Sequence, residues 1–136
     1  MLVEHARNVL GIAGASHAES KGGGQPIITP LSCSLDGKSI EVRPRAGTVL
    51  SALYGGVASV TEPTTCNYGL DPARHDVASS GGMIVSATDG TGEVRAVERA
   101  DHPFFVATLY QPQLRSSPGS PHPVWSGFVA AVARTA

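Results

Sequence analysis

The sequence has little charge and no cluster of basic residues. Its 136 residues include 10 Lys and Arg and 11 Asp and Glu, so charged residues make up 15% of the chain. An average soluble domain has roughly 25%. The two lysines and eight arginines are scattered singly along the sequence. Because nucleic-acid binding needs several cations along one surface, we expect no nucleic-acid partner.

Long apolar runs are also missing, and cysteines are few. No run approaches the roughly 20 apolar residues that a membrane-spanning helix needs. The first residues, MLVEHAR, include a glutamate and lack the charged-then-apolar order of a secretory signal peptide. Two cysteines, Cys33 and Cys66, can form at most one disulfide, and so few fit a reducing compartment. We therefore expect a cytoplasmic protein without membrane contact.

Sequence motifs for metals and nucleotides are absent as well. Neither cysteine has a CxxC or HxxxH neighbour at the spacing of a zinc site. The glycine runs at 22–24 and 55–56 lack the strand-to-helix context of a phosphate loop, and no GxxxxGK[ST] motif occurs. We expect no metal and no cofactor.

Sixteen glycines and ten prolines divide the chain into short elements. Apolar spacing, capping residues and terminal glycines predict helices over 2–10, 48–54, 72–80 and 124–132. Asp71-Pro72 has the form of a helix N-cap followed by proline at the first helical position. The stretch 20–26, with three consecutive glycines, is expected to be a mobile loop.

Runs of alternating or β-branched residues predict strands between these helices. Asp36-Gly37 separates the runs 27–35 and 38–43, which is a strong hairpin signal. Further strands are expected over 64–70, 83–88, 93–99 and 104–110. Helices interspersed with partly antiparallel strands indicate an α/β fold.

The residues offer few candidates for chemistry. Cys66 would be a reactive thiolate if it met a helix N-terminus, but a small buried apolar side chain is the more common role. Cys33, inside a predicted hairpin strand, is expected in the core. Asp101 and His102 form a candidate acid-base pair, although a half-exposed histidine before a proline is the more common arrangement. Gln111 and Gln113 end the strongest strand, where side chains often line a cleft.

Three segments resemble a known family. Residues 102–113 read HPFFVATLYQPQ, and residues 122–131 read HPVWSGFVAA. They are similar to the end of the glutamine amidotransferase domain of CTP synthases, where a strand runs into His-Pro-Glu and a terminal helix follows. Residues 4–11 and 15–19 resemble the helix and loop after the family's nucleophile elbow, and 66–71 falls at its HRYEVN strand. The resemblance is strongest to the divergent CTP synthase C-terminal region-related proteins.

This resemblance implies an α/β fold, the C-terminal part of a class I glutamine amidotransferase-like (flavodoxin-like) domain, with a mixed sheet and antiparallel hairpins. Residues 1–136 would be one partial domain that lacks the N-terminal half and the nucleophile elbow, which would lie before Met1. Such a partial domain leaves a sheet edge and an apolar helix face uncovered. We therefore expect a homo-oligomer, or a partner chain that covers the open sheet edge.

The resemblance also places the family's functional positions. Its catalytic His and Glu fall at Gln111 and Gln113, and its substrate-binding arginine falls at Asn67, while Tyr68 is retained. The amide of Gln111 cannot act as a base, and Gln113 has no charge to stabilise an imidazolium. No catalytic set is therefore intact. Candidate ligand-binding residues are Cys66, Asn67, Tyr68 and Tyr110, with a small polar ligand such as glutamine.

Three functional hypotheses remain. The first is a CTP synthase-related pseudoenzyme, linked to pyrimidine metabolism, that serves as a binding or interaction module. The second is an enzyme, either the glutaminase part of a CTP synthase completed by a missing N-terminal segment or partner chain, or new chemistry at Cys66. The third is the C-terminal piece of a longer chain that begins here at an internal methionine.

Overall fold

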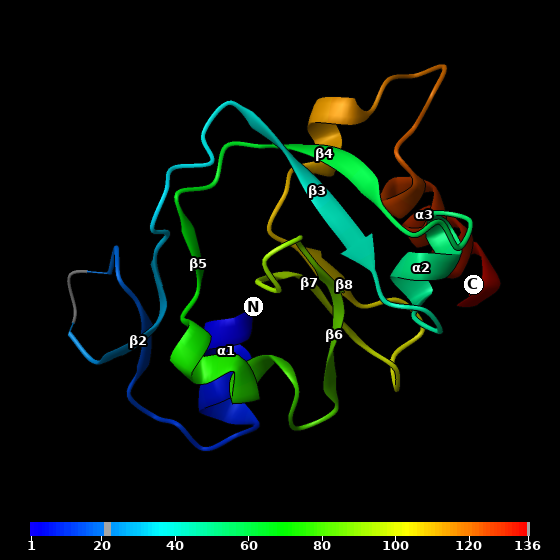
Figure 1. Cartoon of the computed structure of the whole chain (residues 1–136). Coiled ribbons are helices and arrows are strands. Elements are labelled where there is room, and N and C mark those ends of the chain that lie inside the picture. Colours follow the sequence, from blue (N-terminus) through cyan, green and yellow to red (C-terminus); the bar gives the residue numbers. More distant parts are fainter. Residues whose placement is uncertain (21–22, 136) are drawn as a thin grey trace.

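Two β-sheets organise the chain in the computed structural model, which describes residues 1–20 and 23–135 (Figure 1). The smaller sheet has the order β1-β2-β5, formed by β1 (Ala15–His17), β2 (Gln25–Pro30) and β5 (Tyr68–Leu70). β1 and β2 are parallel, whereas β2 and β5 are antiparallel. The first helix, α1 (Leu2–Asn8), places Ala6 against Ile27 in a small apolar core beside this sheet.

The larger sheet is entirely antiparallel and has the order β4-β3-β6-β7-β8. Its strands are β3 (Lys38–Pro44), β4 (Val60–Thr64), β6 (Met83–Thr88), β7 (Val94–Arg99) and β8 (Val106–Thr108). The helices α2 (Val49–Leu53) and α3 (Pro123–Thr135) lie together at the end of the molecule away from α1 (Figure 1). Leu50 and Val124 from these helices pack on Val42 and Tyr110 and form the main core.

The predicted helices are present, with local differences. α1 ends at Asn8, two residues before the predicted end, with Val9 as its C-cap. Gly11 follows at φ 70°, and Ile12 N–H bonds to the Ala6 carbonyl at 2.9 Å. The Thr48 hydroxyl caps α2 by accepting from Ser51 N–H at 3.1 Å. The predicted helix 72–80 is a 3-10 segment, η1 (Pro72–Ala78), which is kinked where Arg74 has non-helical dihedrals.

The predicted hairpin around Asp36-Gly37 is wrong. A turn does form there, with Gly37 at φ 67° and Lys38 N–H bonded to the Leu35 carbonyl at 3.1 Å. The flanking strands belong to different sheets, because β2 pairs with β1 and β5 while β3 pairs with β4 and β6. Pro30 ends β2, and the next amide, from Leu31, bonds to the Asn67 carbonyl at 2.9 Å. Pairing with a distant segment therefore outweighed the local turn signal.

Other strand boundaries also shift. The predicted strand 64–70 is the end of β4 and all of β5, separated by 65–67, and β4 begins four residues earlier at Val60. Strand β8 is shorter than the predicted 104–110. Cys33 is exposed rather than in the core, because it lies in the irregular segment after β2.

The predicted loop 20–26 is described only in part. Lys21 and Gly22 lie outside the described residues, and Gln25 and Pro26 already belong to β2. In the part of the chain that the structure describes, no helix is long and apolar enough to cross a membrane.

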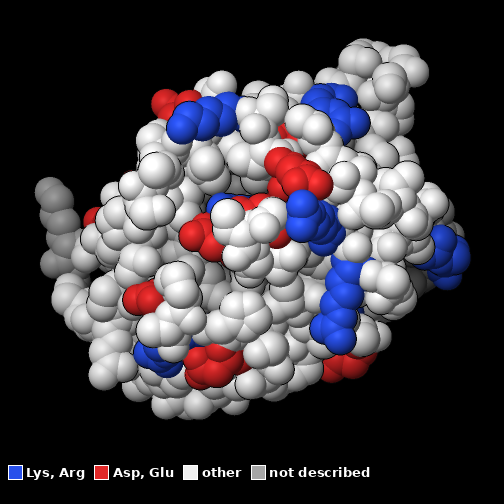
Figure 2. Space-filling model, in the orientation of Figure 1, with Lys and Arg blue, Asp and Glu red and all other residues white. Residues whose placement is uncertain are grey.

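Acidic and basic groups neighbour one another on the surface drawn in Figure 2, in small groups separated by uncharged side chains. Several of the chain's exposed charges form close pairs, among them Arg43 with Glu41 at 3.0 Å and Arg99 with Asp101 at 2.6 Å. A surface of mixed sign such as this face does not favour a polyanion.

Candidate functional site

A pocket of about 490 Å³ lies where β8 runs into the short 3-10 segment η2 (Pro112–Arg115) and faces α3. Most of its lining is aromatic or aliphatic, with two side-chain amides and two hydroxyl groups. It is lined by Met1, Phe104, Phe105, Val106, Thr108, Tyr110, Gln111, Pro112, Gln113, Val124, Trp125 and Phe128. No side chain in this set carries a charge or a thiol. We call this hollow the amide pocket.

The two glutamines lie at the start of η2, with Gln111 as its N-cap and Gln113 in its first turn. Gln111 is half-buried, and its Oε1 accepts a hydrogen bond from Thr65 N–H at 2.8 Å. Its own backbone N–H donates to the Pro63 carbonyl on β4 at 3.3 Å. Gln113 is exposed. The Gln111 amide therefore ties η2 to the segment after β4, which is a structural task that needs no ionisable group.

The other predicted ligand-binding residues follow β4 and do not line the amide pocket. Cys66 is a half-buried free thiol next to Thr65, and its N–H bonds to the Thr64 hydroxyl at 3.2 Å. Asn67 accepts from the Ser34 hydroxyl at 2.6 Å, while the Tyr68 ring lies 4.9 Å from the ring of His17. Of the predicted site residues, the structure brings Tyr110, Gln111 and Gln113 together, and places Cys66 close to Gln111 through Thr65.

Asp101 and His102 do not form an acid-base pair. The Asp101 carboxylate accepts two hydrogen bonds from Arg99, at 2.9 and 2.6 Å, and these bonds hold the pKa of that carboxyl below its usual value. His102 is exposed, and its Nδ1 accepts from Phe104 N–H at 3.2 Å. Both groups shape the turn that leads into β8.

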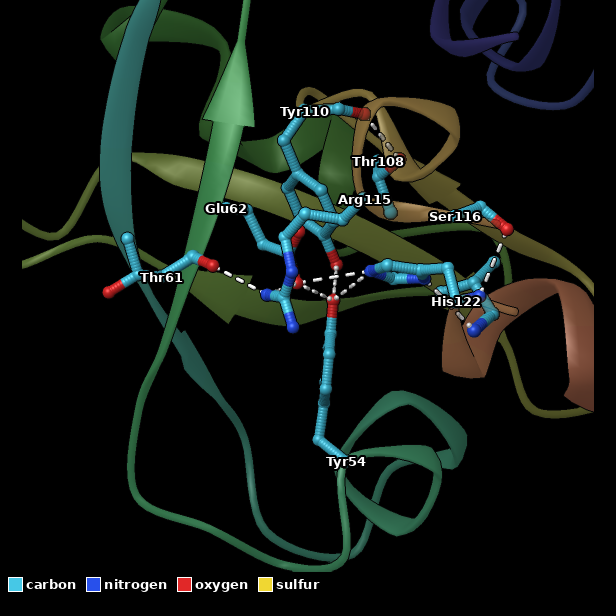
Figure 3. A network of polar contacts seen from close by, with 9 residues as sticks. Tyr54, Thr61, Glu62, Thr108, Tyr110, Arg115, Ser116 and His122 are labelled. Carbon is cyan, nitrogen blue, oxygen red and sulfur yellow. Dashed lines mark hydrogen bonds and ion pairs between the residues drawn. The ribbon is translucent and has the colours of Figure 1, made fainter. Parts of the chain in front are cut away.

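A buried polar network, drawn in Figure 3, shares Tyr110 with the amide pocket, and sequence reasoning missed it. Glu62 on β4 has 0% exposure, and its Oε1 accepts from the Tyr54 hydroxyl at 2.8 Å and from Arg115 Nη1 at 2.8 Å. His122 Nε2 lies 3.1 Å from the same oxygen, and the Tyr110 hydroxyl lies 3.1 Å from that of Tyr54. We call these five residues the Glu62 network.

The hydrogen bonds of His122 define its tautomer. Nδ1 accepts from Val124 N–H at 3.2 Å in the first turn of α3, so that nitrogen carries no proton. Nε2 then carries the proton and donates it to Glu62. The backbone N–H of His122 donates to the Ser116 hydroxyl at 3.1 Å. His122 thus caps α3 and anchors it to β4.

The two tyrosines of the network stay protonated. Burial raises the pKa of Tyr54 far above its ordinary value, and Tyr110 and Glu62 raise it further. Burial also raises the pKa of Tyr110; its contact with the Tyr54 hydroxyl opposes this effect and the Glu62 charge adds to it. Neither hydroxyl can therefore act as a base for a ligand in the amide pocket.

One oxygen of Glu62 carries all of the contacts. Its Oε2 is buried and has no hydrogen-bond partner among the residues that the structure describes. Side chains along β4 alternate between the two faces of the sheet, and this alternation buries Glu62 and Thr64. A glutamate at an inward position of a strand was therefore the sequence signal that could have indicated the network. Within 1–20 and 23–135, no three His, Cys, Asp or Glu side chains gather as a metal site would require.

Comparisons with known proteins give a consistent result. The CTP synthase of Aeropyrum pernix is 37% identical over 145 residues, which cover 98% of this chain and 27% of that protein. The CTP synthase of Methanospirillum hungatei is 36% identical over 141 residues, which cover 96% of this chain and 26% of that protein. The chain spans about a quarter of the length of these relatives. No family model matches it.

Solved structures agree with these relatives. The glutaminase domain of Trypanosoma brucei CTP synthase, with bound acivicin, matches 98% of this chain with a TM-score of 0.88 and 26% identity. The match covers 56% of that structure's chain. A putative GMP synthase subunit from Thermoplasma acidophilum matches 79% of this chain and 49% of its own, with a TM-score of 0.58 and 14% identity, which supports the fold alone.

Proposed function

Because this chain is related in sequence and fold to the glutaminase domain of CTP synthases, we propose that it is a pseudoenzyme of that class. In this proposal it keeps the class I glutamine amidotransferase fold and does not hydrolyse glutamine with its own residues. Residues 1–136 act as a partial amidotransferase-like domain. The amide pocket binds a small polar ligand, for which glutamine is the first candidate.

The uncharged lining of the amide pocket carries the proposal. Hydrolysis of an amide by a thiol needs a nucleophile beside a base that can take its proton. Gln111 and Gln113 cannot titrate, and the nearest thiol, Cys66, is not part of the lining. The tyrosine hydroxyl at the pocket belongs to the Glu62 network and stays protonated. The geometry thus offers hydrogen bonds to a ligand but no base for proton transfer.

The lining also indicates which ligands suit the pocket. Amides donate and accept hydrogen bonds without carrying charge, and the aromatic walls supply apolar contact. The lining contains no guanidinium for the α-carboxylate of glutamine, so the neutral side-chain amide is the part of glutamine that suits this pocket. The related T. brucei domain has acivicin bound, which supports the proposal that this chain takes a small-molecule ligand.

Ammonia release from glutamine by the purified chain tests this proposal. We expect no release above the buffer background, at any glutamine concentration. Cys66→Ala and Cys33→Ala form a matched pair, because Cys66 follows Thr65, whose N–H bonds to Gln111, whereas Cys33 is exposed after β2. Glutamine-dependent release that disappears only in Cys66→Ala would show that the chain is an enzyme. Glutamine binding is measured separately, as shifts of the Gln111 side-chain and Thr65 backbone amide signals in NMR spectra.

The alternative, an active glutaminase part of a CTP synthase, has no feature of the described chain in its favour. It would need a base at the amide pocket, where Gln111 now bonds to Thr65 N–H. The enzymatic alternative at Cys66 would need a proton acceptor beside that thiol.

A further inference from the structure

The segment 31–35, which follows β2, lies against the residues around Cys66. Leu31 N–H donates to the Asn67 carbonyl at 2.9 Å, and Leu35 N–H donates to the Cys66 carbonyl at 3.3 Å. The two acceptors are neighbours in the sequence, whereas the two donors are four residues apart. The segment therefore forms an arch whose two ends are both fixed to the Cys66–Asn67 stretch.

Cys33 occupies the middle of this arch, two residues from each fixed end. Its side chain is exposed, and Cys66 is a half-buried free thiol. The Ser34 hydroxyl adds a third bond between the segments, to the Asn67 side chain at 2.6 Å. Among the described residues, the amides of residues 32–34 donate no backbone hydrogen bond, so the middle of the arch can move while its ends stay fixed. The two cysteines of the chain are thus held on neighbouring segments.

We propose that Cys33 and Cys66 are a redox-sensitive modification site, where a reversible disulfide forms within the chain and acts on the amide pocket. A disulfide needs Cα atoms about 4.4–6.8 Å apart, and an arch fixed at both ends beside Cys66 leaves Cys33 only a short movement to make. Disulfides in reducing compartments are usually transient and redox-sensing, so a reversible pair needs no oxidising compartment. The inference rests on the proposed function, because it treats the amide pocket as the ligand site that the disulfide controls.

A small-molecule disulfide such as glutathione disulfide is the oxidant, and the reaction is thiol–disulfide exchange. The exposed Cys33, as its thiolate, attacks one sulfur of glutathione disulfide, so that a mixed disulfide forms and the first glutathione leaves. The thiolate of Cys66 then attacks the Cys33 sulfur, the S–S bond between the two cysteines forms, and the second glutathione leaves. The two cysteines lose two electrons and two protons, which convert glutathione disulfide into two glutathione molecules.

Two hydrogen-bonded routes link Cys66 to the residues that lead into the amide pocket. Thr65, the residue before Cys66, donates its N–H to Gln111 Oε1 at 2.8 Å. The Thr64 hydroxyl accepts from Cys66 N–H at 3.2 Å and donates to the Leu109 carbonyl at 3.3 Å. A disulfide that draws Cys66 toward the arch shifts both routes, and Gln111 belongs to the pocket lining. Oxidation should therefore turn the Gln111 amide away from Thr65.

Redox titration of the purified full chain tests whether the disulfide forms. After equilibration with glutathione and glutathione disulfide, intact-mass spectrometry should show a chain that has lost two hydrogen atoms. A non-reduced peptide digest should join Cys33 to Cys66, and dithiothreitol should reverse the change. The proposal is wrong if each thiol retains a glutathione instead, or if disulfides form only between two chains.

Single-thiol variants and a relocated thiol show whether the arch selects the pair. Cys33→Ala and Cys66→Ala should each take up one glutathione and form no disulfide within the chain. The double variant Cys33→Ala, Ala46→Cys again has two thiols, but the new one lies at an exposed position between β3 and α2. It should gain glutathione only, and an internal disulfide in this variant would contradict the proposal. Circular dichroism confirms that each variant is folded.

NMR spectra of the reduced and oxidised chain test the link to the amide pocket. On oxidation, the backbone amide signal of Thr65 and the side-chain amide signals of Gln111 should shift. Cys66→Ala with glutathione on Cys33 is the control and should show neither shift. We expect the dissociation constant of glutamine to rise about fivefold in the oxidised form, as for the loss of one neutral hydrogen bond. If both signals keep their positions in the disulfide form, the disulfide does not act on the pocket.

The remaining outcomes separate this inference from the proposed function. Glutamine-dependent ammonia release by the reduced chain would overturn the proposed function, while a disulfide that shifts the Gln111 signals would still support the inference. If glutamine binds neither form, glutamine is not the ligand, and the signals of Thr65 and Gln111 alone decide the inference. Equal binding of glutamine to both forms would support the proposed function and contradict control of the pocket by the disulfide.

Discussion

The amide pocket and the Glu62 network use the same elements but differ in charge. Tyr110 contributes to both, and Gln111 in the pocket and Arg115 in the network belong to the same short segment. In the network, a buried carboxylate meets an arginine, a histidine and two tyrosines (Figure 3). At the pocket surface, the side-chain amides of Gln111 and Gln113 are neutral. The charged side chains thus lie in the buried Glu62 network, whereas the lining of the amide pocket carries no charged side chain.

This difference shows that a cluster of buried polar residues does not by itself mark a catalytic site. Both ring nitrogens of His122 form hydrogen bonds within the protein, because Nδ1 caps α3 and Nε2 bonds to Glu62. The backbone N–H of His122 bonds to the Ser116 hydroxyl. Because both nitrogens of the His122 imidazole are engaged in this way, neither is available to take a proton from a substrate. The role of His122 is to join α3, β4 and η2 into one unit, and that unit positions the pocket.

The largest effect should come from removing the centre of the network. Glu62→Ala leaves Tyr54, Arg115 and His122 without their shared acceptor inside the protein. Breaking a buried charged pair by deleting one partner costs about 3–5 kcal/mol. Arg115 is 45% exposed and can turn to solvent, so we expect the lower half of that range. Urea unfolding followed by circular dichroism measures the loss.

Glu41→Ala is the matched control for that change. Glu41 lies on the neighbouring strand β3, is exposed, and pairs with Arg43 on the surface. Its removal should leave the unfolding midpoint unchanged, because exposed ion pairs contribute little. If the two variants lose equal stability, the Glu62 network does not hold the fold as described.

A smaller effect is expected at Asp89, a carboxylate that is buried only in part. Although burial acts in the opposite direction, hydrogen bonds from Thr91 and Arg95 hold the pKa of Asp89 below its ordinary value. A lowered folded-state pKa stabilises the protein above about pH 4, the unfolded value, and this stability is lost as the pH falls. Asp89→Asn should cost about 1–2 kcal/mol at pH 7.

The pH dependence provides the check on Asp89. Unfolding free energies of the wild type and Asp89→Asn, measured from about pH 7 to about pH 3, should converge at the acidic end. A difference that stays constant over this range would mean that the Asp89 charge does not contribute. Asp36→Asn, at an exposed loop carboxylate, serves as the control and should leave the unfolding free energy at pH 7 unchanged.

Local signals in the sequence predicted much of the fold. Apolar spacing located α1 and α3, the cap at Thr48 located α2, and the alternating runs on either side of Asp89 predicted the pair β6 and β7. The failures were non-local. The strong turn at Asp36-Gly37 does form, but pairing of β2 with β5, a strand distant in the sequence, decides where the strands lie. No short-range pattern contains that information.

The candidate site could be predicted only in part, for a similar reason. Resemblance to a family identified Gln111 and Gln113, and the structure places both at one pocket. It did not identify the Glu62 network, whose members come from the end of α2, from β4, from η2 and its approach, and from the start of α3. Such a set becomes visible only when the chain has folded, although a glutamate on the inward face of a strand was a usable hint.

The smallest effect should follow from restoring charge at the amide pocket. In the double variant Gln111→His, Gln113→Glu, an imidazole replaces the amide that bonds to Thr65 N–H, at a cost of about 1 kcal/mol. Ammonia release should remain at background, because a base without a nucleophile at the pocket cannot form the covalent intermediate.

Cys66 is the thiol that could act as the nucleophile, since it follows Thr65. The same double variant with Cys66→Ala is therefore the control. Release that appears in the double variant and vanishes in the triple variant would show that Cys66 reaches the pocket. In that case, the side chains at positions 111 and 113 alone would account for the lack of charge in the amide pocket compared with the Glu62 network.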